Sequence, residues 1–286
     1  MADLVLGVAT SHLAMVLRQT PEQEADQVAR FRAGFATLAD AIEQARADTL
    51  IVVSAEHINK FFLDNLPAFA IGTAEAFDGP VEDIPIEKRT ITAARGLAWH
   101  LLRHGLDHGV DWARADEWSL DHGMMVPLHF LDPDGALPIV PVFVNCAAPP
   151  YPALDRCRAV GGALADAVRA WPEPARVAMV ACGGLSHSPG DVRMGFVDEA
   201  FDRQFLDRLR AGDARAAASV SDERVEQAGS STAEIRSWLM LAGAFGGQAM
   251  QVVTYEPIKG FGTGCAQGLI WPDAAKATPQ TVPGHD

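Results

Sequence analysis

The chain has 286 residues, of which 49% are hydrophobic and 21% are charged, a composition typical of an ordinary globular protein with a substantial core. Its formal net charge is −14. This charge argues against binding to nucleic acid and to anionic membranes, because both need a basic surface.

The four cysteines are widely spaced and include no C-x-x-C pair. This spacing excludes a zinc ribbon and a disulfide framework and is typical of a protein kept in a reducing cytoplasm. The N-terminus shows no signal-peptide pattern, and no uninterrupted apolar run reaches the length of a membrane span. We therefore expect a soluble, cytoplasmic protein.

The first part of the chain predicts a β-α-β unit. Residues 4–10 have the pattern of a strand that ends near His12, and a threonine–proline pair at 20–21 predicts the start of a helix. Residues 49–57 read as a strand buried on both faces that ends at His57. The carboxyl ends of parallel strands meet at one edge of a sheet, so we expect both histidines to emerge at that edge. The apolar stripe of the helix is formed by Val28, Phe31, Phe35, Leu38 and Ile42.

Strand and helix patterns alternate through the rest of the chain, with no internal repeat and no domain linker. They predict one α/β domain over residues 1–275, with a central twisted, largely parallel or mixed sheet flanked by helices and a site at the strand C-terminal ends. Residues 276–286 read as a flexible tail. The remaining predicted elements are strands at 69–71, 139–145, 176–182, 251–255 and 267–271, a loop at 78–86, and helices at 89–104, 152–171, 198–210 and 231–245.

Four histidines stand at predicted strand or loop ends: His12, His57, His122 and His187. Two imidazoles and one carboxylate on one face, with open positions opposite, form the facial triad of non-haem Fe(II) oxygenases. His12 and His57 could supply the two imidazoles of such a site.

Three carboxylates compete for the third position. Glu56 is next to a candidate histidine, but adjacent strand residues point to opposite faces. Asp121 precedes His122 and could orient it instead. Glu234 lies in the sequence S-T-A-E, where it could be a ligand or the partner of Ser231 in a capping box. The residue pattern alone leaves these two roles of Glu234 open.

Three other motifs predict no chemistry. The run G-L-S-H-S at 184–188 ends in serine where a nucleophile elbow needs glycine, so a serine hydrolase is disfavoured. The run G-F-G-T-G at 260–264 is not set between a strand and a helix and is interpreted as a turn. His100 and His104 lack the glutamate of H-E-x-x-H, which favours a structural role.

Five short motifs, in order between residues 11 and 245, together resemble the class III extradiol catechol dioxygenases. This family includes the protocatechuate 4,5-dioxygenase β chain, gallate dioxygenase and 2,3-dihydroxyphenylpropionate 1,2-dioxygenase. The loop after His187 is shorter than in the last of these enzymes, and S-H-L-A lacks the proline of many members. The matching motifs are S-H, E-H-I-N-K-F-F, L-D-H-G, G-G-L-S-H-S-P and S-T-A-E-I-R-S-W-L.

The resemblance implies a set of roles for the candidate residues. Fe(II) would be held by His12, His57 and Glu234, as the family's ligands fall on these positions. His187 would remove a catechol proton, and His122 would donate a proton during O–O cleavage. No organic cofactor is implied.

Two further carboxylates have supporting roles in this hypothesis. Asp121 would assist catalysis by tuning His122. Glu56, which stands where relatives often have aspartate, would face away from the metal and orient a ligand through a hydrogen bond.

The implied reaction is extradiol (meta) cleavage of a catecholic aromatic compound by O2 during aromatic degradation, giving a hydroxymuconic semialdehyde-type product. The resemblance also implies a homo-oligomer and leaves room for a separate small partner subunit. Two alternatives stay open: a zinc-dependent hydrolase that uses the same pocket, and a non-catalytic binding relative.

Overall fold

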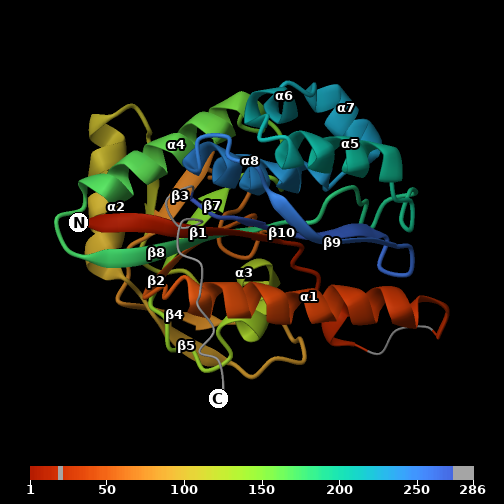
Figure 1. The fold of residues 1–286 in the computed structure, drawn as a ribbon, viewed down its shortest axis with the longest axis horizontal. Helices are drawn as coiled ribbons and strands as arrows, with labels where there is room; N and C mark the ends of the chain where they lie inside the picture. Colours follow the sequence, from red (N-terminus) through yellow and green to blue (C-terminus); the bar gives the residue numbers. More distant parts are fainter. Residues whose placement is uncertain (19–21, 273–286) are drawn as a thin grey trace, which may run out of the picture.

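A mixed eight-stranded sheet runs through the middle of the protein (Figure 1). The computed structural model describes residues 1–18 and 22–272. A separate two-stranded hairpin is made of β4 (Ala76–Gly79) and β5 (Arg89–Thr92). In spatial order, the strands of the large sheet are β6 (Ala113–Ala115), β3 (Phe69–Gly72), β7 (Ile139–Val144), β2 (Thr49–Ser54), β8 (Ala175–Cys182), β1 (Ala2–Thr10), β10 (Thr263–Ile270) and β9 (Gln251–Ile258).

The four central strands β7, β2, β8 and β1 are parallel, which brings their carboxyl ends to one edge. Every residue of β2 and β7 is buried, as expected for strands covered on both faces. Thr10 at the end of β1 and Ser54 at the end of β2 both align with Cys182 at the end of β8. The residues that follow these strands therefore leave the sheet at the same level.

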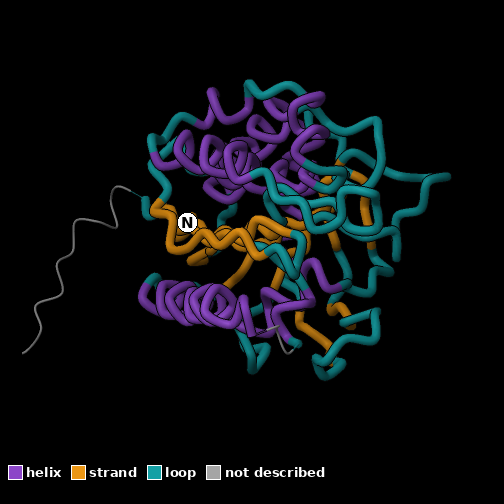
Figure 2. The backbone as a smooth tube through the Cα atoms, turned by 90° about the vertical axis from the view of Figure 1, so that its right-hand side faces the viewer, coloured by secondary structure: helices purple, strands orange, loops and turns teal. Residues whose placement is uncertain are grey.

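Helices cover both faces of the sheet, which Figure 2 shows between two helical layers. One core contains the apolar sides of α2, α4, α5, α6 and α8, and the other contains those of α1 and α3 together with the β4–β5 hairpin. None of the described helices is long and apolar enough to cross a membrane. The helices are α1 (Ala25–Gln44), α2 (Arg95–Asp107), α3 (His122–Leu131), α4 (Leu154–Ala170), α5 (Glu199–Arg210), α6 (Ala214–Ala218), α7 (Asp222–Ala228) and α8 (Ile235–Ala244), and the 3-10 helices are η1 (Ala14–Leu17), η2 (Glu22–Glu24) and η3 (Thr232–Glu234).

Helices α4 and α8 approach so closely that only glycine fits at two of their contact points. A Cβ atom at Gly161 of α4 would lie 1.8 Å from the carbonyl oxygen of Met240, and one at Gly243 of α8 would lie 1.9 Å from that of Arg158. This contact fixes α8, and with it the adjoining η3, against the sheet.

The predicted fold class, an α/β domain with a mixed sheet and helices on both faces, is confirmed. The apolar stripe of α1 is buried as expected. The helix predicted at 89–104 is wrong at its start, because β5 occupies Arg89–Thr92 and α2 begins at Arg95. The predicted helix start at 20–21 and the predicted tail at 276–286 lie outside the described residues, so the domain boundary at 275 stays a prediction.

Candidate metal centre and active site

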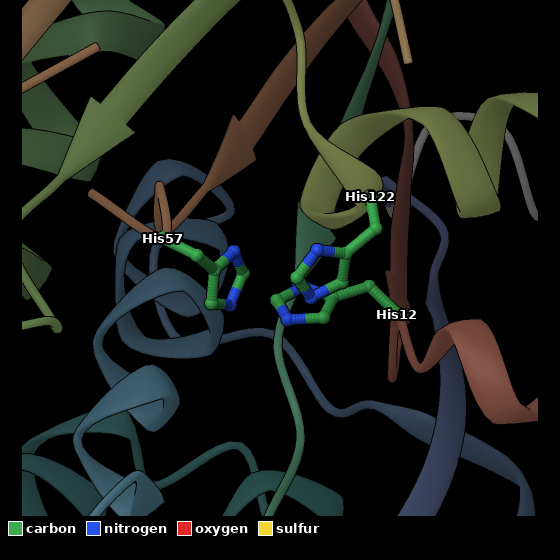
Figure 3. A group of neighbouring side chains, drawn as sticks. All are labelled: His12, His57 and His122. Carbon is green, nitrogen blue, oxygen red and sulfur yellow. The ribbon is translucent and has the colours of Figure 1, made fainter. Parts of the chain in front are cut away.

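Five ionisable side chains meet at the carboxyl edge of the parallel strands. His12 follows β1, His57 follows β2, and His187 lies on the loop after β8. His122 is the first residue of α3, and Glu234 is the last residue of η3. Figure 3 shows three of the imidazole rings, those of His12, His57 and His122, turned toward one another.

The carboxylate of Glu234 lies at the centre of this group. Its Oε2 is 3.3 Å from Nε2 of His12, and its Oε1 is 3.5 Å from Nε2 of both His57 and His187. The side chain is only 5% exposed, and Oε2 also accepts a hydrogen bond of 2.6 Å from the backbone N–H of Gly184. A buried carboxylate surrounded by imidazoles offers the oxygen and nitrogen atoms that ligate metals in proteins.

Glu234 does not form the capping box with Ser231 that the sequence allowed. Ser231 precedes η3, and its side chain makes no capping hydrogen bond. The backbone N–H of Ser231, which a capping box would give to Glu234, donates instead to the carbonyl oxygen of His187. The Glu234 side chain is thus free to point into the cluster of histidines.

The distances from Glu234 to its neighbouring histidines are close to those between ligands of one metal ion. Bonds of 2.0 to 2.2 Å to an ion place neighbouring ligand atoms about 3 Å or slightly more apart. Glu234 has this spacing to each of two histidines through different oxygens: Oε2 is 3.3 Å from Nε2 of His12, and Oε1 is 3.5 Å from Nε2 of His57. His122 also has a ring nitrogen within 4.8 Å of those of His12 and His57. Its ring, however, is stacked on that of His57, with ring centroids 4.0 Å apart, so the two imidazoles lie face to face.

Charge balance in the cluster keeps Glu234 ionised. Burial by itself would raise the pKa of its carboxyl, but His12 and His187 hold that pKa well below its ordinary value. Burial also lowers the pKa of His12, which favours the neutral imidazole that a metal requires. The outward nitrogen of His12, Nδ1, is buried and has no hydrogen-bond partner among the described residues.

Asp121 orients His57 and not His122, contrary to the expectation from sequence adjacency. Its Oδ2 accepts hydrogen bonds from Nδ1 of His57 at 2.7 Å and from the backbone N–H of His57 at 2.8 Å. Its Oδ1 caps α3 by accepting from the backbone N–H of Gly123. Burial opposes ionisation, but His57 outweighs it and lowers the pKa of Asp121 to about 2. The ionised carboxylate fixes the proton of His57 on Nδ1 and leaves Nε2 to face Glu234.

Glu82 is a site residue that the sequence analysis missed. It lies in the loop between β4 and β5, and its Oε1 is 2.6 Å from Nδ1 of His122. Its Oε2 accepts from the backbone N–H of the same histidine at 2.9 Å. No periodicity or motif marks Glu82, since it is 40 positions from His122 in a loop with two prolines.

Glu56 is turned away from the candidate ligands. Its carboxylate accepts hydrogen bonds from the backbone N–H groups of Asn59, Lys60 and Phe61. It therefore shapes the turn after His57 and makes no side-chain bond to any described histidine, unlike the ligand-orienting role expected for it. Within that turn Ile58 has φ +58°, a strained conformation for a β-branched residue.

His187 is held by the loop after β8. Its Nδ1 lies 2.7 Å from the carbonyl oxygen of Leu185, which can only accept, so Nδ1 carries the proton. The preceding Ser186 donates through its backbone N–H and its hydroxyl to Asp202, each at 2.8 Å. Tyr255 donates to the same carboxylate at 2.9 Å. The loop is thereby tied to α5 and β9.

The other motifs lie apart from this cluster. His100 is on α2 and its Nε2 bonds the carbonyl oxygen of Ala167 on α4, which is a structural contact. His104 packs on the next helical turn, with its ring stacked on that of His108. Residues 260–264 include the turn between β9 and β10, in agreement with the interpretation of that glycine-rich run.

Comparison with known proteins identifies the family. The family model described as the catalytic LigB subunit of aromatic ring-opening dioxygenase matches residues 6–265. The 2,3-dihydroxyphenylpropionate/2,3-dihydroxicinnamic acid 1,2-dioxygenase of Rhodococcus sp is 29% identical, over 89% of this chain and 95% of the relative. A second enzyme of that description, from Pseudomonas putida, is 34% identical over 66% of this chain and 58% of its own.

A solved structure supports the fold alone. The uncharacterized protein JW3007 from Escherichia coli K12 superposes with a TM-score of 0.56 at 17% sequence identity, covering 93% of this chain and 99% of that one. The family match extends over almost the whole described chain and confirms the resemblance that the five sequence motifs carry. The chain therefore belongs to the family of catalytic LigB subunits of aromatic ring-opening dioxygenases.

Proposed function

We propose that this protein is an Fe(II)-dependent extradiol dioxygenase that opens the ring of a catecholic substrate with O2, and that His12, His57 and Glu234 hold the iron. The observation that carries the proposal is the buried Glu234 carboxylate, which lies 3.3 Å from Nε2 of His12 and 3.5 Å from Nε2 of His57. Two imidazoles and one carboxylate that leave adjacent positions open are typical of non-haem Fe(II) oxygenases.

The bound iron would supply the redox chemistry, because its open positions take the catechol oxygens and O2 and allow electrons to pass between them. The protein's contribution is to orient the ligands. The bond from Nδ1 of His57 to Asp121 is the carboxylate–histidine pair that commonly supports metal-binding imidazoles. This pair supports His57 as a ligand through Nε2.

We assign the removal of a catechol proton to His187. Its Nδ1 is committed to the carbonyl oxygen of Leu185, so Nε2 is the atom that can accept a proton from substrate. That Nε2 atom is 3.5 Å from Oε1 of Glu234, so it lies beside a proposed iron ligand. Histidine is suited to this step because it titrates near the working pH.

We assign proton donation during O–O cleavage to His122. It is close to both histidine ligands, with ring centroids 5.5 Å from His12 and 4.0 Å from His57. Its Nδ1 is occupied by Glu82, which leaves Nε2 to donate to the reacting oxygen atoms. Two histidines with separately fixed protons can divide the roles of base and acid.

The substrate class follows from the family and the relatives, whose printed names specify 2,3-dihydroxyphenylpropionate and 2,3-dihydroxicinnamic acid. For this chain we propose a catechol and leave the ring substituent to experiment. A homo-oligomer and a separate small subunit remain predictions from the resemblance, and a cytoplasmic location remains a prediction from the cysteine spacing and the N-terminal sequence.

The test is reconstitution of the metal-free protein with Fe(II) under anaerobic conditions, followed by O2 and a panel of catechols. The panel comprises protocatechuate, gallates, alkylcatechols, 2,3-dihydroxyphenylpropionate and aminophenols. We expect a visible ring-fission chromophore with at least one of them. His187→Ala should retain iron and lose most turnover. Turnover that persists without O2, or with zinc in place of iron, would favour the hydrolase alternative.

A further inference from the structure

Glu82 contacts the proposed proton donor at two points. Its Oε1 lies 2.6 Å from Nδ1 of His122, and its Oε2 accepts the backbone N–H of the same residue at 2.9 Å. We propose that Glu82 is a positioning residue for catalysis, which fixes the proton of His122 on Nδ1 and turns Nε2 toward the reacting atoms. The catalytic part of this inference rests on the proposed function of His122.

The same two-point contact occurs at His57. There Asp121 accepts both the backbone N–H, at 2.8 Å, and Nδ1, at 2.7 Å. A carboxylate can only accept hydrogen bonds, so each imidazole must carry its proton on Nδ1. Two neighbouring, stacked imidazoles are thus held in the same tautomer by two carboxylates from separate segments.

Glu82 is held in place independently of the ring it contacts. The backbone N–H of Val81 donates to the carbonyl oxygen of Leu120 at 2.9 Å, and the N–H of Leu120 donates to the carbonyl oxygen of Asp78 at 2.7 Å. These bonds fix the start of the loop against the segment that leads into α3. The Glu82 side chain is 25% exposed, so its orientation is set by its hydrogen bonds and not by burial alone.

The chemical consequence lies in which atom can exchange a proton. With Nδ1 committed to Glu82, the ring of His122 can give up or take a proton only at Nε2. After the proton is donated, the ring is left neutral with its remaining proton on Nδ1, ready to be protonated again at Nε2.

Glu82→Gln tests this role because it preserves the shape of the side chain and reverses the hydrogen bond to Nδ1 of His122. The amide oxygen can still accept the backbone N–H of His122, and the NH2 group must then donate to Nδ1. That arrangement forces the ring proton onto Nε2. Glu82→Asp keeps the charge and should restore part of the lost activity. Asp83→Asn is the matched control, since Asp83 is an exposed neighbour in the same loop.

We expect Glu82→Gln to lower kcat by about 10- to 100-fold, the range typical of residues that orient a catalytic group. The KM for the catechol should change by less than about twofold, iron content should match that of the wild type, and Asp83→Asn should behave as the wild type. Wild-type kcat in Glu82→Gln, or loss of iron in that variant, would overturn the proposal.

The tautomer itself is measured by 15N NMR of the His122 ring in the metal-free protein. We expect a protonated Nδ1 in the wild type and a protonated Nε2 in Glu82→Gln. A wild-type ring protonated on Nε2 alone would contradict the inference whether or not the protein cleaves catechols. If instead the tautomers are as expected but no catechol is cleaved by the wild type, the proposed function fails and Glu82 loses its catalytic role.

Discussion

Three histidines of the candidate site have Nδ1 held by a hydrogen bond, so each has Nε2 available for the chemistry of the site. A fixed Nδ1 proton leaves Nε2 to bind metal or to exchange a proton. His12 differs, because its buried Nδ1 has no partner among the described residues. The partners at Nδ1 are Asp121 for His57, Glu82 for His122 and the carbonyl oxygen of Leu185 for His187.

At the scale of single residues, the proposed role of Glu234 as an iron ligand can be tested by substitution. Glu234→Gln keeps the shape of the side chain but removes the charge, so it should lower iron affinity by more than the roughly 10- to 100-fold loss typical of outer hydrogen-bond partners. Iron content after reconstitution and desalting measures this effect. Folding, followed by circular dichroism, should be retained.

Ser231→Ala is the matched control for the capping interpretation. Loss of a working N-cap costs about 1 kcal/mol. Since Ser231 makes no side-chain cap bond, we expect its removal to change the free energy of unfolding by less than about 0.5 kcal/mol and to leave iron content unchanged. Normal iron binding by Glu234→Gln would exclude Glu234 as a ligand.

At the scale of elements, the site depends on how η3 is joined to the end of β8. A Cβ atom at Gly183 would lie 2.8 Å from the carbonyl oxygen of Glu234, so the two segments are in direct backbone contact. Trp238 of α8 donates from its indole N–H to the carbonyl oxygen of Gly183 at 2.9 Å. Together these contacts place the Glu234 carboxylate beside the loop that carries His187.

The anchor of that loop predicts a pH dependence of stability. Asp202 is fully buried, and burial raises its pKa to about 6 although Ser186 and Tyr255 donate to it. The native protein therefore binds this proton more tightly than the unfolded chain does, for which the ordinary value is 3.8. The resulting stabilisation is present below pH ~4 and is lost as the pH rises through ~6.

Urea unfolding of the wild type and Asp202→Asn at pH 4 and pH 7 measures this contribution. The free energy of unfolding of the wild type minus that of the variant should fall by up to roughly 3 kcal/mol between the two pH values. Asp207→Asn, which removes an exposed carboxylate of the same helix, is the control for the loss of a surface charge. A wild-type-minus-variant difference that is the same at pH 4 and pH 7 for Asp202→Asn would contradict the raised pKa.

For the molecule as a whole, the central strands and two candidate ligand histidines could be predicted from the sequence. The runs at 50–53 and 139–144 are apolar without interruption, which is the pattern of strands buried on both faces. Parallel strands then bring His12 and His57 to one edge. The short strands β4, β5 and β6 were missed or misassigned because their three or four residues carry too little periodicity and, unlike the apolar run at 69–71, include charged or polar residues.

The hydrogen bonds around the histidines could not be predicted in this way. Asp121 is next to His122 in sequence, yet as the N-cap of α3 its carboxylate turns back over the helix start and reaches His57, 64 positions away. Glu82 reaches His122 only through the β4–β5 hairpin, whose position depends on tertiary packing. Neighbours along the chain therefore gave the wrong pairing for Asp121.

Metal binding should also stabilise the whole molecule, because the proposed ligands come from the segments after β1 and β2 and from η3, which are distant in sequence. At a free Fe(II) concentration about 100 times the Kd, the gain is about 2.7 kcal/mol. In a protein of this size that corresponds to a rise in Tm of roughly 5 °C. Anaerobic differential scanning fluorimetry should show this rise in the wild type and none in Glu234→Gln. Equal rises in both would mean that the stabilising metal binds elsewhere.

The most direct measurement of the central claim is the stoichiometry of the reaction with the best catechol of the panel. O2 uptake by the iron-loaded protein is followed with an oxygen electrode, and the mass of the product is measured by mass spectrometry. We predict one O2 consumed per product and a product that contains both oxygen atoms, formed only when iron and O2 are present. A product formed without O2 uptake, or one that has gained the elements of water alone, would contradict ring cleavage by a dioxygenase.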